Sequence, residues 1–199
     1  MITSIYLFLS ALYLWQQENE HRWLVLLKPL PILLLAGWAT VNVQDSWLVA
    51  ALLLSAAGDI ALGLDSERYF VYGLSFFLLA HVAYAVVFGR TIEFTPLAIL
   101  PLLIILALSL WLLPRLLPRL GQLRIPVLCY VGVIIIMSVL GVLHSPFSIM
   151  LATGAIIFMV SDATIALDKF VEPVPNRDFL VMATYYLAQY LIAFSFSGI

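Results

Sequence analysis

Long apolar runs, separated only by short polar joints, are the feature that most constrains how this chain can fold. Hydrophobic residues make up 64% of its 199 residues and charged residues only 10%. A soluble domain is about half apolar and about a quarter charged. A transmembrane helix needs about 20 predominantly apolar residues, with a range of roughly 17–25. The sequence therefore predicts an all-α integral membrane protein.

Reading between the polar joints gives eight candidate transmembrane helices. They cover residues 1–16, 23–42, 46–64, 69–88, 95–113, 124–143, 147–167 and 179–197. No joint is long enough for a soluble domain, so we expect a single transmembrane domain over residues 1–199 that acts in or at the bilayer. The single cysteine, Cys129, excludes an intrachain disulfide and a zinc site built on cysteines.

Lysine and arginine are distributed unevenly between alternate joints. One side of the predicted protein carries Arg22, Lys28, Arg68, Arg115, Arg119, Arg124, Lys169 and Arg177. The other side carries only Arg90. Because basic joints stay in the cytoplasm, the rich side should be cytoplasmic and both termini should lie outside. The compact joints favour a bacterial inner (cytoplasmic) membrane.

Two aspartates, Asp59 and Asp162, interrupt the third and seventh apolar runs in similar sequence settings. Each is followed six positions later by a further aspartate, Asp65 and Asp168. A carboxylate at membrane depth is costly and usually marks a functional site. A repeated one suggests that two copies of a half-protein bring two acids together.

The helix after each aspartate also carries a matching polar residue, His81 in the first case and Gln189 in the second. These matches predict two parallel four-helix repeats, over residues 1–94 and 95–199, related by an axis along the membrane normal. Chance similarity among small and apolar residues is the alternative.

The rise of an α-helix places the polar side chains in two layers. At 1.5 Å per residue, Asp59 and Asp162 lie about 9 Å below the cytoplasmic end of their helices, with Lys28 at a similar depth. His81 and Gln189 lie roughly 16–20 Å in. Neighbours on the same helical faces or beside the aspartates are Tyr84, Ser161, Tyr185 and Tyr186. The two layers predict a cavity that opens to the cytoplasmic leaflet.

Each of these residues also has a purely structural interpretation. Lys28 could snorkel to the interface or form a buried ion pair with one aspartate. A lone intramembrane histidine such as His81 could hydrogen-bond across helices, and tyrosines near helix ends are usually interfacial anchors. Two aspartates at matched depth are harder to explain in this way.

Paired carboxyl groups in a low dielectric resist double ionisation, so one would keep its proton and act as a general acid beside the other. Glycoside hydrolysis uses such a pair to stabilise an oxocarbenium-like centre. A vinyl ether needs related chemistry, because a proton delivered to the alkene carbon creates an oxocarbenium ion that water captures. A lipid with a vinyl-ether chain and a phosphate head would place its phosphate near Lys28. This chemistry needs no metal or cofactor.

The chain resembles the YhhN-like family over nearly its whole length. The residues that carry the resemblance are Lys28-Pro29, Gly58-Asp59, Gly73 with Phe76-Phe77, His81 to Tyr84, Gly154-Ala155 with Phe158, Ser161-Asp162, and Tyr185-Tyr186 with Ala188-Gln189. That family includes the lysoplasmalogenases, which hydrolyse the vinyl-ether bond of lysoplasmalogen to a fatty aldehyde and glycerophosphoethanolamine or glycerophosphocholine.

The resemblance implies that Asp59 and Asp162 are the catalytic pair, although it leaves open which is the acid. Depth and helical face further suggest that Lys28 holds the phosphate, while His81, Tyr185 and Gln189 orient water or the glycerol hydroxyl. The expected partners are a lysophospholipid substrate and bilayer lipid, without nucleic acid or an obligate protein partner.

Two other classes of function remain open from the sequence. Parallel repeats and intramembrane carboxylates also suit a proton- or cation-coupled transporter of a small molecule or lipid. The transporter interpretation is weakened because the polar layers lie in the cytoplasmic half of the predicted bundle, and the outer half offers few matching groups. The third reading is a non-catalytic lipid-binding or regulatory membrane protein.

Overall fold

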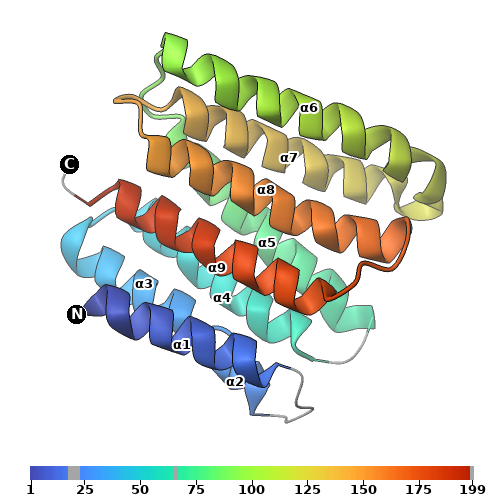
Figure 1. Cartoon of the computed structure of the whole chain (residues 1–199), viewed down its shortest axis with the longest axis horizontal. Coiled ribbons are helices and arrows are strands. Elements are labelled where there is room, and N and C mark those ends of the chain that lie inside the picture. Colours follow the sequence, from blue (N-terminus) through green and yellow to red (C-terminus); the bar gives the residue numbers. More distant parts are fainter. Residues whose placement is uncertain (18–22, 65–66, 198–199) are drawn as a thin grey trace. The chain divides into compact units, whose positions relative to one another are not determined.

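The prediction of an all-α protein is confirmed. A computed structural model describes residues 1–17, 23–64 and 67–197, and within these ranges the regular structure is entirely helical (Figure 1). The α-helices are α1 (Ile2–Gln16), α2 (Leu24–Leu27), α3 (Leu30–Asn42), α4 (Ser46–Leu62), α5 (Glu67–Phe88), α6 (Ile99–Leu116), α7 (Arg124–Leu143), α8 (Ile149–Phe170) and α9 (Arg177–Ser195). Short 3-10 turns cover Pro96–Ala98, Leu117–Arg119 and Gly121–Leu123. Arg22 and Asp65, used in the charge and depth counts, lie outside the described residues.

Several helices are long and apolar enough to cross a membrane. Within the described ranges these segments are Leu24–Asn42, Arg68–Phe88, Pro96–Arg119, Gly121–Leu143 and Ile149–Phe170. Two shorter apolar helices, Ile2–Gln16 and Ser46–Leu62, accompany them. The protein is therefore a multi-pass membrane protein, while the count of eight spans and the outward termini stay predictions.

Local sequence chemistry explains where several helices begin. Asp45 precedes α4, and its carboxylate accepts hydrogen bonds from the backbone N–H groups of Trp47 and Leu48 at 2.9 and 3.1 Å. Ser148 caps α8 in the same manner through the N–H of Leu151. Such caps satisfy N–H groups that have no partner in the first turn of a helix.

The predicted second span is divided by two prolines. Lys28 follows α2, and α3 begins at Leu30, between Pro29 and Pro31. A proline has no N–H group, so each one removes a hydrogen bond from the helical series. The break therefore interrupts the series of hydrogen bonds next to Lys28, while Lys28 and Pro29 keep helical backbone angles.

The first of two compact units comprises residues 1–87 and 196–199. In this unit α3 packs against α1 and α4. Two glycines bring α4 and α5 close together. A Cβ atom on Gly58 would lie 2.7 Å from the Phe77 ring, and one on Gly73 would lie 2.6 Å from the Leu62 side chain. Small residues permit such close approach of membrane helices.

The second unit comprises residues 88–195. Here α8 packs against α6, α7 and α9, and the four helices run side by side (Figure 1). An apolar core joins α6, α7 and α8 through Ile105, Ile134 and Met159. On the opposite side of α6, Leu100, Leu103, Leu106 and Leu110 are exposed, as expected of a lipid-facing surface. The internal repeat stays a prediction.

Gly154 sets the approach of α8 to α9 in the second unit. A Cβ atom at this position would lie 3.0 Å from the Ile192 side chain and 3.1 Å from the Ile192 backbone nitrogen. The backbone atom cannot move aside without displacing α9. The position of α9 relative to Asp162 therefore depends on the absence of a side chain at residue 154.

We predict that Gly154→Leu destabilises the protein, because the added side chain would separate α8 from α9. Overpacking of this kind costs about 1–3 kcal/mol. Gly132→Leu on α7 is the matched control, since a Cβ atom there would meet nothing within 4 Å. Thermal unfolding in detergent should show a lower midpoint for the first variant and little change for the second. Equal midpoints would contradict the assigned packing of α8 on α9.

Candidate active site

The first unit carries four of the predicted site residues. Asp59, His81 and Tyr84 are buried, with 1%, 0% and 0% of their surfaces exposed. Lys28 is half-buried at the proline break before α3. Asp59 belongs to the last turns of α4, while His81 and Tyr84 lie three residues apart on α5. Charged and polar groups are rarely buried to this extent unless they are paired or functional.

Phe77 contacts both His81 and the residue that precedes Asp59. The Nδ1–H group of His81 donates a hydrogen bond to the Phe77 carbonyl oxygen, with a distance of 2.6 Å. The ring of the same phenylalanine packs directly on Gly58, the residue before Asp59. In a neutral imidazole with its proton on Nδ1, Nε2 carries the lone pair. The ring therefore presents its basic nitrogen on the side away from its own helix backbone.

Ser55 is a buried residue that the sequence analysis did not single out. It lies one turn before Asp59 on α4 and is fully buried, and its hydroxyl has no hydrogen-bond partner among the described residues. Other helical hydroxyl groups donate to the carbonyl four residues earlier, as in Thr40, Ser75, Ser109 and Thr164. The sequence signal was its spacing of four residues from Asp59, which places both on one helical face.

The second unit carries Asp162 together with a partner that the sequence analysis missed. Asp162 lies on α8 with 9% of its surface exposed. The Tyr130 hydroxyl, from α7, donates a hydrogen bond to Asp162 Oδ2 at 3.0 Å. Tyr130 follows Arg124 by six residues, the same interval that separates Asp162 from Asp168. The depth count applied to the aspartates would therefore have placed Tyr130 in their layer.

The remaining predicted residues lie along the contact between α8 and α9. Ser161 is buried, and its hydroxyl donates to the Val181 carbonyl oxygen at 3.0 Å. This bond joins the two helices next to Asp162, and the oxygen of Ser161 keeps its capacity to accept a further hydrogen bond. Tyr185, Tyr186 and Gln189 on α9 are also buried.

The Tyr185 ring is held by aromatic contacts. It packs edge-to-face on Phe158 of α8, with ring centroids 5.6 Å apart and planes at 83°. It also contacts the neighbouring Tyr186 ring at a centroid distance of 5.6 Å. Edge-to-face pairs add to the stability that burial alone gives. The aromatic rings thus fix the helical face that also carries Gln189.

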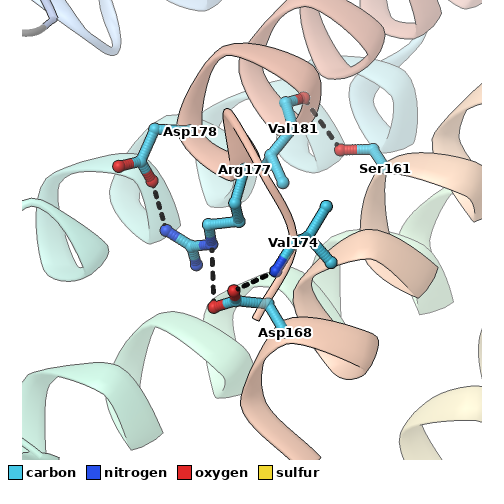
Figure 2. A network of polar contacts seen from close by, with 6 residues as sticks. All are labelled: Ser161, Asp168, Val174, Arg177, Asp178 and Val181. Atoms are coloured by element: carbon cyan, nitrogen blue, oxygen red, sulfur yellow. Dashed lines mark hydrogen bonds and ion pairs between the residues drawn. The ribbon is translucent and has the colours of Figure 1, made fainter. Parts of the chain in front are cut away.

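A charged network closes the turn between α8 and α9 (Figure 2). The Asp168 carboxylate accepts a hydrogen bond from the Val174 N–H group at 3.0 Å and lies 3.6 Å from Arg177 Nε. The Arg177 guanidinium also binds the carboxylate of Asp178. The ionic groups are partly exposed, so solvent weakens their attraction. The backbone bond to Asp168 shapes the turn that returns the chain from α8 to α9.

The predicted site residues therefore form two groups, one in each unit. Asp59, His81, Tyr84 and Lys28 belong to the first, and the second contains Asp162 with the α9 residues. The juxtaposition of the two aspartates across one cavity stays a prediction. Among the described residues, no cluster of three or more His, Cys, Asp or Glu side chains could hold a metal ion.

Several known proteins are similar to this chain over most of its length. It is 34% identical to lysoplasmalogenase TMEM86A of Homo sapiens over 200 residues, which cover 92% of this chain and 82% of the relative. Its identity to lysoplasmalogenase TMEM86B of Homo sapiens is 35% over 188 residues, covering 92% and 79%. A lysoplasmalogenase of Mycobacterium tuberculosis is 33% identical over 137 residues, covering 64% and 51%.

No solved structure matches the chain. The model of the YhhN family matches residues 5–196. This match covers both units and every predicted site residue, and it agrees with the similarity to the lysoplasmalogenases. The chain belongs to the YhhN family.

Proposed function

We propose that this protein is a lysoplasmalogenase that hydrolyses the vinyl-ether bond of lysoplasmalogen. The products are a fatty aldehyde and glycerophosphoethanolamine or glycerophosphocholine. The observation that carries the proposal is the similarity to lysoplasmalogenases over 92% of the chain. The buried aspartates support it, because they offer carboxyl groups of the kind that this hydrolysis needs.

Asp59 and Asp162 form the catalytic pair in this proposal. One carboxylic acid gives its proton to the alkene carbon further from the ether oxygen, and the oxygen lone pair stabilises the resulting cation. Water adds to the carbon next to that oxygen and loses a proton to the other carboxylate. In the last step the carboxyl group that received the proton from water gives it to the glycerol oxygen. The hemiacetal hydroxyl gives its proton to the other carboxylate, and the bond to the glycerol oxygen breaks, so that an alcohol and an aldehyde leave and both carboxyl groups return to their starting state.

The other polar residues bind and orient the substrate. Lys28 holds the phosphate, because an ammonium group forms charge-assisted hydrogen bonds with phosphate oxygens. His81, Tyr185 and Gln189 orient water or the glycerol hydroxyl, with Tyr84, Tyr186 and Ser161 beside them.

The proposed topology has eight spans with both termini outside a bacterial inner membrane. The charge distribution supports it, since Arg90 is the only basic residue on the proposed outer side. Two parallel repeats, over residues 1–94 and 95–199, would then bring the two aspartates to the same depth. The cavity opens to the cytoplasmic leaflet, from which a lysophospholipid can enter sideways.

We predict that Asp59→Asn and Asp162→Asn each lower kcat/KM for lysoplasmalogen by roughly 1,000-fold, because an amide can neither give nor take the proton. Aldehyde release by purified protein in detergent, with choline and ethanolamine substrates, is the measurement. Asp45→Asn is the matched control, since asparagine caps α4 as well as aspartate does. It should keep wild-type activity.

The outcomes of this experiment separate the function from its mechanism. Wild-type activity in both folded aspartate variants would contradict the paired-acid mechanism but leave the enzyme assignment intact. Failure of the wild-type protein to release aldehyde would overturn the enzyme assignment. Substrate accumulation in proteoliposomes without product would then favour a transporter.

We predict that Lys28→Met raises KM roughly tenfold and leaves kcat nearly unchanged, because one charged hydrogen bond to phosphate is lost. An alkenyl glycerol without phosphate tests the cause, since the variant and wild type should hydrolyse it equally. Lys169→Met, in the last turn of α8, is the control. A defect of the same size with the phosphate-free substrate would contradict a phosphate-binding role.

A further inference from the structure

The hydrogen bond between Tyr130 and Asp162 joins two helices at a residue of the proposed catalytic pair. The phenol oxygen lies 3.0 Å from Asp162 Oδ2, and the two residues are 32 positions apart in the chain. Both belong to the second unit, in which α7 packs against α8. The bond therefore forms through the tertiary packing of these two helices and not between neighbouring residues of one helix.

The ring of Tyr130 is held in place by apolar neighbours. It packs against the buried cluster that contains Ile105, Ile134 and Met159. A tyrosine has only two side-chain torsions, so a packed ring gives its hydroxyl a defined position. The second torsion of an aspartate has a broad preference, and the carboxyl plane is poorly fixed by the rotamer alone. The phenol restrains the orientation of the Asp162 carboxyl group through its hydrogen bond.

A phenol is also suited to a carboxyl group that changes its protonation state. The O–H group donates to a carboxylate, and the phenol oxygen can accept from a carboxylic acid. A lysine or arginine partner could only donate. Tyr130 can therefore remain bonded to Asp162 before and after a proton transfer, whichever member of the pair acts as the acid.

We infer that Tyr130 is a positioning residue for Asp162. Its hydroxyl holds the Asp162 carboxyl group in one orientation while that group exchanges a proton with the substrate or water. This inference rests on the proposed function. It adds a residue outside the set expected from the sequence. Small displacements of a catalytic group are costly, because about 1 Å of misplacement can reduce a rate 100-fold.

Removal of the Tyr130 hydroxyl tests the inference directly. We predict that Tyr130→Phe lowers kcat roughly 10- to 100-fold with KM within about twofold, because the substrate still binds while the carboxyl group loses its restraint. Tyr190→Phe is the matched control. Its ring stacks on Phe194 at 4.4 Å, and loss of its hydroxyl should leave both constants unchanged.

A double-mutant cycle distinguishes positioning from an independent effect. Asp162→Glu keeps a carboxyl group but moves it by one methylene relative to the phenol. The loss caused by Tyr130→Phe should then largely disappear in the Asp162→Glu background, since the bond is already broken. Multiplicative losses in the double variant would overturn the inference.

Other outcomes of these measurements would overturn the inference or the proposed function. Wild-type kcat in Tyr130→Phe, or a raised KM at unchanged kcat, would contradict a positioning role. Loss of activity with a lowered unfolding midpoint in Tyr130→Phe would indicate a structural role for that hydroxyl. A Tyr130→Met variant with a wild-type midpoint should still show a lowered kcat, and a wild-type kcat in that variant would overturn the inference. An inactive wild-type protein would refute the proposed function and is distinguishable from all of these results.

Discussion

The hydrocarbon interior of a membrane offers no water, so a polar group placed there is costly unless it finds a partner within the chain. Backbone groups find theirs in helices, which is why the described residues have little other regular structure. Hydroxyl groups such as those of Ser109 and Thr164 donate to the preceding helical turn. The carboxyl group of Asp162 requires a side chain from another helix, and α7 provides it. The packing of α7 on α8 thus provides a hydrogen-bond partner for a carboxyl group that is costly to bury alone.

Close packing of helices makes those few partnerships possible. Gly58 allows the Phe77 ring to lie beside the backbone next to Asp59, and Gly154 allows α9 to approach α8. In lipid, helix association is driven largely by packing and interhelical hydrogen bonds. The glycines and the polar residues therefore depend on each other, because the short distances between backbones bring donors within reach of acceptors.

Much of the fold could be predicted because the length of an apolar run is a direct physical requirement. The helical class follows from it, and α8 begins and ends within three residues of the predicted 147–167 span. The extension to Phe170 was not predicted, because the sequence alone did not reveal that Asp168 accepts the Val174 N–H group across the turn. The division of the second span after Lys28 was not predicted either. It arises from two prolines within a long apolar run.

The candidate site was predicted less completely. Asp59, Asp162, His81 and Gln189 attracted attention because polar residues are rare in apolar runs, and all four are buried. Tyr130 and Ser55 did not, since tyrosine and serine are common in membrane helices. Spacing in the sequence gives the depth of Tyr130 and the helical face of Ser55, but their contacts and burial arise only when the helices pack.

The break between α2 and α3 has an electrostatic consequence for Lys28. Pro29 and Pro31 deprive the carbonyl oxygens of Val25 and Leu27 of the N–H groups that a regular helix would supply. Both oxygens carry partial negative charge, and both belong to residues that precede the lysine by no more than three positions. An ammonium group loses its hydration when it enters an apolar region, and carbonyl dipoles are the natural substitute for water. The two prolines thus leave carbonyl groups without their regular helical donors close in the chain to a cation.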